Sequence, residues 1–298
     1  MTVISPLTGS TEVVLESRLL PKQIISQYKT QFGVDVSGYF KGLKTVDIYR
    51  CKTSGLRFYY PFNLAGDGQF YADLARVYKG YYSVWKWEHE KVNGLILSEQ
   101  KVLEIGCGRG YFLEKLKEKK AQATGLDFNP DAVEYGKTHD LNIVDETITA
   151  HAQKQAGTYD MVCAFQLFEH VNEVGDFLKD SIACLKKGGL LAIGVPNNDC
   201  YIFKEDPYHT LNVPPHHMLL WAPDSLRYVA QLFDLELIEV AVQPSVSVNK
   251  STAYLLWLKK QFRDSAVVNL LHLTTRFLVK RLPVFTQGPT VVAVYRKK

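Results

Sequence analysis

Residues Val102 to Gly110 read V-L-E-I-G-C-G-R-G, an apolar stretch with one acidic residue followed by glycines at alternate positions. Gly106, Gly108 and Gly110 leave no Cβ where the backbone has to turn sharply and lie against a ligand. A helix that begins directly after such a turn points its N-terminus at the same ligand. This stretch therefore predicts a buried strand, a ligand-binding loop and a helix.

A carboxylate at the end of the next predicted strand belongs to the same pattern. Asp127 ends the run A-T-G-L-D, 21 residues after Gly106. A carboxylate at this edge of a parallel sheet can accept hydrogen bonds from both hydroxyls of a ribose. A dinucleotide-binding loop needs G-x-G-x-x-G, but its third glycine position falls on Tyr111, and Gly110 gives G-x-G-x-G instead. The spacing therefore disfavours a nicotinamide enzyme.

The glycine pattern, with Glu104 ahead of it, resembles the first motif of class I methyltransferases that depend on S-adenosylmethionine. The resemblance implies that the chain binds S-adenosylmethionine and releases S-adenosylhomocysteine. The residues expected to bind the cofactor are Glu104, Gly106, Cys107, Gly108, Gly110, Asp127, Phe128 and Gln166.

From Ser98 onward, strand-like and helix-like segments alternate, which predicts a parallel sheet covered by helices on both faces. The expected fold is α/β, a doubly wound, Rossmann-like and mostly parallel sheet of seven strands. Strands are predicted over 101–105, 123–126, 142–148, 159–165, 190–195, 235–242 and 290–295, and helices over 111–120, 130–139, 174–185 and 223–232.

The chain divides into three predicted parts. Residues 1–65 form a small N-terminal region, 66–97 an aromatic helical cap, and 98–298 the cofactor-binding domain. Within this domain, residues 244–288 are inserted before the last strand, and apolar residues recur there at three- and four-residue intervals. We expect the insertion to be helical.

Charge is distributed unevenly along the sequence. The net charge is +4, but residues 250–298 carry ten Lys or Arg and a single acid, Asp264. This basic insertion predicts either a solvated helix face or attraction to a phosphorylated acceptor or an anionic membrane surface. The five cysteines form no C-x-x-C pair, and no secretory signal or apolar run of membrane-spanning length is seen, which predicts a reduced, cytoplasmic protein.

The N-terminal region resembles, in two places, the zinc ribbon that precedes many bacterial glycan-cluster methyltransferases. Cys51 to Leu56, C-K-T-S-G-L, is similar to its second half, and Ser5 to Ser10, S-P-L-T-G-S, to its first. In that family the two halves carry paired cysteines, but here hydroxyl residues replace three of the four. Zinc prefers thiolate and imidazole ligands. We therefore expect a ribbon-shaped remnant and no zinc.

A candidate metal-binding turn follows the fourth predicted strand. Gln166, Glu169 and His170 are spaced so that one helical turn would aim them the same way. The sequence resembles the E-x-x-E-H turn that binds a divalent cation in ubiquinone-type O-methyltransferases. Because a neutral amide replaces the first carboxylate, Mg²⁺ should bind weakly, and no metal is expected. In metal-independent relatives the Glu and His orient the loop and cofactor.

A pair of histidines lies in a loop before the predicted helix 223–232. Val213 to Met218 reads V-P-P-H-H-M, and this loop resembles that of the glycan-type and ubiquinone-type families. The two prolines stiffen the approach to His216 and His217, and an imidazole can take the proton of an acceptor hydroxyl. His216, His217 and His170 are therefore the candidate catalytic residues, with a hydrogen-bonding role in the loop as the alternative.

Histidine bases suit an oxygen acceptor better than an amine, because a hydroxyl must lose its proton to become a good nucleophile. We expect methylation of a hydroxyl on a saccharide or glycan-pathway intermediate, which could be phosphorylated or lipid-linked. The alternatives are O-methylation of a quinone precursor or phenol, C-methylation of a nucleotide sugar, and a scaffold without turnover. Nucleic acid is not an expected partner, because no RNA-binding module accompanies the basic residues.

Overall fold

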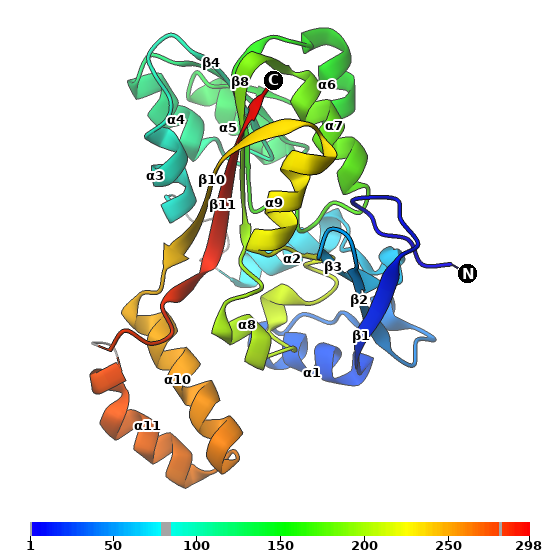
Figure 1. Ribbon diagram of the computed structural model, residues 1–298, viewed down its shortest axis with the longest axis vertical. Coiled ribbons are helices and arrows are strands. Elements are labelled where there is room, and N and C mark those ends of the chain that lie inside the picture. Colours follow the sequence, from blue (N-terminus) through cyan, green and yellow to red (C-terminus); the bar gives the residue numbers. More distant parts are fainter. Residues whose placement is uncertain (1, 79–84, 280–281) are drawn as a thin grey trace.

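The computed structural model describes residues 2–78, 85–279 and 282–298. Its strands form two sheets, one of seven strands and one of four, and a helical hairpin extends from one end of the molecule (Figure 1). None of the helices in these ranges is long and apolar enough to cross a membrane.

The larger sheet has the strand order β10-β11-β8-β7-β4-β5-β6. The pairs from β8 to β6 are parallel, whereas β11 runs antiparallel to both of its neighbours. The predicted seven-stranded, mostly parallel sheet is confirmed. The strands are β4 (Lys101–Ile105), β5 (Gln122–Leu126), β6 (Asn142–Val144), β7 (Tyr159–Phe165), β8 (Leu185–Pro196), β10 (Leu235–Pro244) and β11 (Gln287–Lys297).

Helices cover both faces of this sheet (Figure 1). Neighbouring residues of one strand point to opposite faces, so Val102 packs in the cluster of α3 and α4, and Leu103 in that of α7 and α9. Fully burying one such side chain stabilises the fold by about 1.5–3 kcal/mol. The helices are α3 (Trp87–Asn93), α4 (Tyr111–Glu118), α5 (Pro130–Thr138), α6 (Ile148–Gln155), α7 (Val174–Ala183) and α9 (Pro223–Leu232).

Two predicted boundaries are wrong. The third strand ends at Val144 instead of 148, and helix α6 follows it. Thr147 caps this helix by accepting a hydrogen bond from the Ala150 amide. This cap stabilises a helix beginning at Ile148, where the sequence had suggested a strand. The other error concerns the fifth strand, predicted to begin at 190, because β8 already begins at Leu185 and its pairing with β7 is irregular there.

The smaller sheet is antiparallel, with the order β1-β2-β3-β9. Its first three strands come from the N-terminal region, but β9 comes from the segment just before α9. The N-terminal region is therefore joined to the larger domain by strand pairing. The elements are β1 (Val13–Leu19), α1 (Pro21–Phe32), β2 (Val46–Cys51), β3 (Arg57–Tyr60), α2 (Gly68–Val77), α8 (Tyr201–Glu205) and β9 (Leu219–Leu220).

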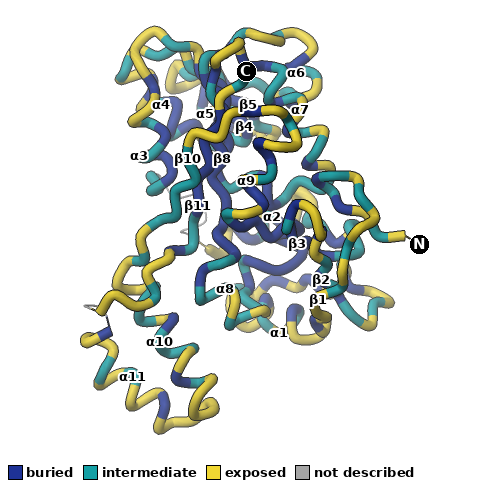
Figure 2. The backbone as a smooth tube through the Cα atoms, viewed as in Figure 1, coloured by how far each residue is buried: buried dark blue, intermediate teal, exposed yellow. Residues whose placement is uncertain are grey.

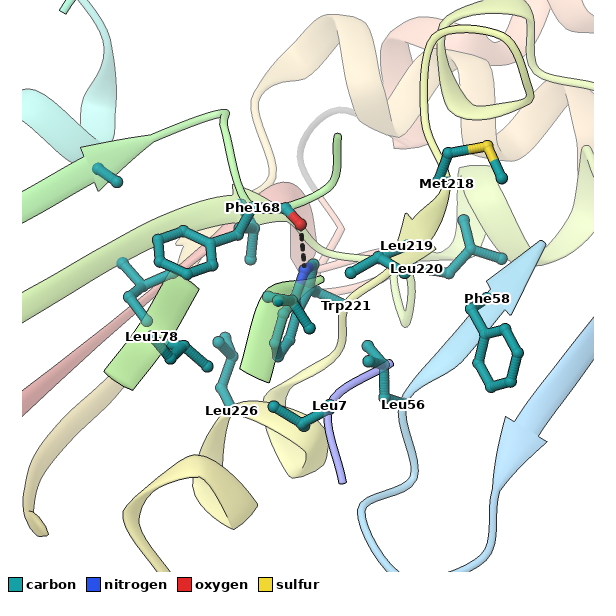
Figure 3. Close-up of a cluster of buried hydrophobic side chains, with 14 of the residues drawn as sticks. Leu7, Leu56, Phe58, Phe168, Leu178, Met218, Leu219, Leu220, Trp221 and Leu226 are labelled. Atoms are coloured by element: carbon teal, nitrogen blue, oxygen red, sulfur yellow. Dashed lines mark hydrogen bonds between the residues drawn. The ribbon is translucent and has the colours of Figure 1, made fainter. Parts of the chain in front are cut away.

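A single hydrophobic cluster connects the two sheets (Figure 3). Trp221, fully buried, lies at its centre and donates a hydrogen bond from Nε1 to the Phe168 carbonyl at 3.2 Å. Leu7 and Leu56 of the N-terminal region pack in the same cluster as Leu178 of α7. The N-terminal sheet thus shares its core with the seven-stranded sheet.

The insertion forms a hairpin of two helices, α10 (Ser247–Phe262) and α11 (Ala266–Val279), so the expectation of a helical insertion is confirmed. The hairpin extends away from both sheets, and most of its surface is exposed (Figure 2). The exposed large apolar side chains of the insertion include Val246, Val248, Trp257, Phe262, Val267, Leu270, Leu271, Leu273, Phe277 and Leu278.

Candidate functional site

A cavity of about 730 Å³ opens where the strand order reverses, at the carboxyl ends of β4 and β7. Ligands bind at this position in doubly wound sheets. The cavity brings together nine of the residues predicted from the sequence: Glu104, Gly106, Cys107, Gly108, Asp127, Gln166, His170, His216 and His217.

The glycine loop forms one wall of the cavity. Gly106 and Gly108 have φ of 71° and 52°, a conformation that residues with a Cβ rarely adopt. The Gly108 amide donates to Asp127 Oδ2 at 2.7 Å, and the Asn129 amide donates to Asp127 Oδ1 at 2.9 Å. The Asp127 carboxylate therefore fixes the loop and still lines the cavity, where its remaining lone pairs can accept further hydrogen bonds.

Two residues expected to bind the cofactor do not line the cavity. A Cβ on Gly110 would lie about 3.0 Å from Leu141 Cδ1 and 3.1 Å from Ile143 Cδ1, so this glycine is needed for packing of the helix against the sheet. Phe128 is 64% exposed and lies outside the cavity lining. Sequence spacing alone does not separate a glycine that approaches a ligand from one that approaches the protein core.

Glu104 places a buried carboxyl group in the cavity wall. Its side chain is almost fully buried, and Oε2 has no hydrogen-bond partner among the described residues. Burial raises the pKa of Glu104 well above its usual value. An ammonium group of a bound ligand would satisfy this oxygen and favour the ionised carboxylate, which fits the methionyl part of S-adenosylmethionine.

Gln166 connects the end of β7 to helix α3. Its backbone is left-handed, with φ of 53°, and its side-chain amide donates to Glu88 Oε1 at 3.0 Å. The helical turn expected to aim Gln166, Glu169 and His170 in one direction is therefore not formed. Gln166 lies in the cavity wall but pairs with Glu88, so the predicted E-x-x-E-H geometry is wrong at its first position.

Three histidines from two other segments of the chain also line the cavity. One ring nitrogen from each of His170, His216 and His217 lies within 4.8 Å of the other two. The rings of His216 and His217 are stacked, with centroids 4.4 Å apart. Among the described residues this is the one group of three or more His, Cys, Asp or Glu side chains close enough to hold a metal ion.

Hydrogen bonds fix the tautomer of each ring. His170 Nδ1 lies 2.6 Å from the His216 carbonyl oxygen, and His216 Nδ1 lies 2.9 Å from the Leu211 carbonyl oxygen. His217 Nδ1 lies 3.2 Å from Asn212 Oδ1. Because these oxygens only accept hydrogen bonds, each Nδ1 carries the proton, and each Nε2 carries a lone pair.

Glu169 is buried beside the three rings. Its Oε1 lies 3.9 Å from Nε2 of both His170 and His217, and neither carboxyl oxygen has a hydrogen-bond partner among the described residues. Burial raises the pKa of Glu169 to about 8 and lowers that of His170 to about 4 and that of His216 to about 3. At neutral pH the imidazoles are therefore uncharged.

The N-terminal region holds the loop that carries His216 and His217. The Tyr59 hydroxyl donates to the Asn212 carbonyl at 3.0 Å, and the Tyr28 hydroxyl donates to the Val213 carbonyl at 3.1 Å. The Gly66 amide donates to the Pro215 carbonyl at 2.8 Å. The loop is thus positioned by residues distant in sequence, which its own sequence does not indicate.

Several cavity residues were not predicted individually. Glu88 and His89 of α3 line the cavity, together with Trp85 and Trp87. The aromatic residues of the cap indicated only that this segment packs onto the sheet. The polar residues Glu88 and His89 beside the tryptophans could have indicated that the segment also contributes to a binding site. Tyr81 and Tyr82 of that cap, like Lys280 and Arg281 of the insertion, lie outside the described residues.

The two segments that resemble the halves of a zinc ribbon, Ser5 to Ser10 and Cys51 to Leu56, meet at Cys51. The thiol lies 3.5 Å from Thr8 Oγ1 and 3.2 Å from Thr53 Oγ1. Ser5 and Ser54 are buried too, and the Thr8 amide donates to Ser5 Oγ at 3.4 Å. Burial acts to raise the pKa of Cys51, but hydrogen bonds from Ser54 and Thr53 outweigh it and lower the pKa to about 6. A single thiolate among hydroxyls is a poor zinc ligand set.

Comparison with known proteins identifies the family to which this fold and site belong. The profile of a family described as "Methyltransferase domain" matches residues 83–240. The chain is 33% identical over 122 residues to a ubiquinone biosynthesis O-methyltransferase of Vibrio parahaemolyticus, covering 38% of this chain and 51% of that protein. A protein of the same name from Escherichia fergusonii is 35% identical over 106 residues, covering 34% and 43%. The chain thus spans about half the length of the curated relatives it matches.

A solved structure supports the same fold. A SAM-dependent methyltransferase from Archaeoglobus fulgidus superposes with a TM-score of 0.51 at 18% identity, covering 78% of this chain and all of that one. The glycine loop, Asp127 directly after β5 and most residues of the cavity lining lie within the range 83–240 that the family profile matches. The chain therefore belongs to the methyltransferase domain family.

Proposed function

We propose that this protein is an S-adenosylmethionine-dependent O-methyltransferase that acts on a phenolic hydroxyl, such as that of a quinone precursor. The observation that carries the proposal is that the glycine loop and the histidine cluster line the same cavity. One wall offers groups suited to the cofactor, and the other offers neutral bases. A donor and an acceptor held there would be aligned and shielded from water, which can contribute about 7–11 kcal/mol to catalysis.

Three groups of the chain would hold the cofactor. Glu104 would accept a hydrogen bond from its ammonium group, Asp127 from its ribose hydroxyls, and the backbone at Gly108 would lie against it. A Cβ at Gly108 would meet nothing within 4 Å, so space for a ligand exists there. When bound, S-adenosylmethionine supplies a methyl group made electrophilic by its sulfonium.

The histidine cluster would take the proton of the acceptor hydroxyl. Nε2 of His170, His216 or His217 can accept a proton, since each Nδ1 holds its own hydrogen against an oxygen. Once ionised, the Glu169 carboxyl group would lie close enough to His170 and His217 to stabilise the imidazolium that forms. The chain would therefore contribute proton removal and alignment.

The phenolic acceptor is preferred to a saccharide because the curated relatives are named for ubiquinone biosynthesis. The cavity also presents apolar and aromatic groups, Phe203, Leu211 and Trp85, that suit a planar ring. A glycan-pathway acceptor is the second candidate. It is favoured by the two ribbon-like segments that meet at Cys51. We interpret them as the remnant of the zinc ribbon that precedes many glycan-cluster methyltransferases, and we propose that this remnant no longer binds metal.

The α10–α11 hairpin would bring the protein to an anionic membrane surface, where a lipophilic acceptor is found. Exposed apolar side chains, with Leu270 and Phe277 among them, lie on the same hairpin as Lys259, Lys260 and Arg276. The strands that carry the hairpin also contribute Gln243 and Thr290 to the cavity wall. Apolar insertion combined with cationic side chains is how peripheral helices bind anionic lipid.

Mass spectrometry with a methyl-labelled donor tests the proposal. The purified protein would be offered phenols with and without an isoprenoid tail, and nucleotide sugars or lipid-linked saccharides in parallel. We expect the label on a phenolic oxygen, with faster turnover for the tailed phenol. Label on a saccharide alone would favour the second candidate. Binding of the donor without label on any acceptor, in the panel or in a cell extract, would contradict the assignment as an enzyme.

A further inference from the structure

We infer that Glu88, oriented by Gln166, selects the acceptor by binding a second polar group on it, a hydrogen-bond donor such as a hydroxyl or an amino group. This group is distinct from the hydroxyl that is methylated. The inference deepens the proposed function and rests on it, because it assigns a residue that determines which acceptor is taken. Glu88 has no part in the proton removal assigned to the histidines.

The first argument is a buried carboxyl group that borders the cavity. Glu88, in the first turn of α3, is 3% exposed, yet it belongs to the cavity lining. Taking a carboxyl group out of water costs free energy unless hydrogen bonds compensate for it. Gln166 Nε2 donates one such bond to Glu88 Oε1, at 3.0 Å. Since a carboxylate can accept about four hydrogen bonds, a donor that enters the cavity can bind to the same group.

The second argument is the strained backbone that carries Gln166. Its φ of 53° is a left-handed conformation that residues with a side chain seldom adopt. The Gln166 amide holds this conformation by donating to the Gly194 carbonyl at 2.7 Å. Strained residues of this kind cluster at sites that bind ligands. Here the strained residue directs its side-chain amide at Glu88, and that hydrogen bond orients the carboxyl group before any ligand binds.

The third argument is the position of Glu88 relative to the two halves of the cavity. Glu88 packs against β8 near its carboxyl end, where a Cβ on Gly194 would lie 3.2 Å from Glu88 Cβ. Strands β7 and β8 lie on one side of β4, whereas β5, which precedes Asp127, lies on the other. Burial, together with the charge of Glu88, raises the pKa of Glu169, which lies beside the histidines. Glu88 is therefore on the side of the cavity where the acceptor would bind.

The chemistry of a carboxyl group selects hydrogen-bond donors. Burial raises the pKa of Glu88, and a donor on the acceptor would favour the ionised carboxylate. A methoxy or keto group offers only lone pairs, which the carboxylate oxygens would repel. A site that hydrogen-bonds one group of its substrate rejects an analogue that lacks this group, because its own buried polar atom is then left unpaired. Glu88 would thus admit a phenol with a second hydroxyl and reject the same phenol once that hydroxyl is methylated.

Matched acceptors test the inference on the wild-type protein. Pairs of phenols would differ only in one further substituent, hydroxyl or methoxy, placed ortho, meta or para to the first hydroxyl. For one of these positions we expect a preference for the hydroxyl compound of about ten- to a hundredfold in kcat/KM, the effect of one hydrogen bond to a charged group. Calorimetry would measure the affinity of the same compounds for the complex with S-adenosylhomocysteine. Equal kcat/KM and equal affinity at every position would overturn the inference. A difference in affinity without methylation of any phenol would count against the proposed methyl transfer and not against recognition by Glu88.

The variant Glu88→Gln then separates hydrogen bonding from the size of the substituent. The single oxygen of the introduced amide would stay bound to Gln166 Nε2, so its NH₂ group would face the ligand and donate. The preference for hydroxyl over methoxy should therefore fall by about tenfold or reverse, while affinity for S-adenosylhomocysteine stays within a few-fold of wild type. Glu118→Gln, at an exposed carboxylate of α4, is the matched control and should keep the wild-type preference. An unchanged preference in Glu88→Gln would overturn the inference, and the wild-type comparison decides it if this variant does not fold.

Discussion

The two walls of the cavity are built in different ways. The cofactor wall is built around one short stretch, Glu104 to Arg109, whose loop is fixed by a hydrogen bond to Asp127 after the neighbouring strand. The acceptor wall comes from the turn after β7 and the loop 211–217, and the N-terminal region positions that loop. A binding site built from one short stretch can be predicted from the sequence. A site assembled from distant segments can be recognised only from the folded structure.

The largest effect should come from the acceptor wall. His216→Ala and His217→Ala should each lower turnover about 10²- to 10⁴-fold, the range typical of a lost general base, and leave cofactor affinity within a few-fold of wild type. Single-turnover rates and calorimetry with S-adenosylhomocysteine would measure the two quantities. His139→Ala is the matched control. Wild-type turnover in both cavity variants would show that neither histidine acts as the base.

A smaller effect, on the other wall, is expected for Asp127→Ala. The variant loses the acceptor of the Gly108 and Asn129 amides and a hydrogen-bond partner of the cofactor. Hydrogen bonds to a charged group contribute about 1.5–3 kcal/mol each, so cofactor affinity should fall about a hundredfold. Calorimetry would compare it with Asp131→Ala, an exposed carboxylate in the next helix. Equal affinities in the two variants would show that Asp127 does not anchor the donor.

His89 tests whether a histidine of the cavity can be purely structural. Its ring packs against Phe112 and Phe165, and burial, together with the charge of Lys86, lowers its pKa to about 3. The unfolded chain binds this proton near pH 6.5, so stability falls as the pH drops below that value. At pH 5 the loss should be about 2 kcal/mol, and His89→Phe should remove it. Denaturant unfolding at pH 5 and pH 7 would measure the difference, and an unchanged pH dependence in the variant would contradict it.

The smallest effect concerns delivery of the acceptor. Arg276→Gln on the exposed face of α11 removes one cation, and one cation near an anionic membrane contributes about 1 kcal/mol. Binding to anionic vesicles should weaken about fivefold, and binding to zwitterionic vesicles should not change. Arg227→Gln, an exposed arginine on α9, is the control. Equal sedimentation of the two variants with anionic vesicles would contradict membrane docking by the hairpin.

The sequence predicted most of the seven-stranded sheet because its strands are short apolar runs bounded by glycine, proline or charge. It failed at 145–155, where Thr147 starts a helix that the apolar pattern does not announce. The site was predicted as a list of residues, and nine of them share the cavity. What the sequence could not show was the partner of each side chain. Gln166 turns to Glu88, and Glu169 meets two histidines, because tertiary packing decides both. The cytoplasmic location and the three-part domain division stay predictions.

The pairing of β3 with β9 has a consequence for how this enzyme could change over time. Tyr28, Tyr59 and Gly66, which donate hydrogen bonds to the histidine loop, belong to the N-terminal region and do not line the cavity. Substitutions in that small sheet would therefore retune which molecule is recognised without disturbing the chemistry of the donor. If the proposed function holds, choice of acceptor and supply of the methyl group depend on separate stretches of one polypeptide, and selection could act on either alone.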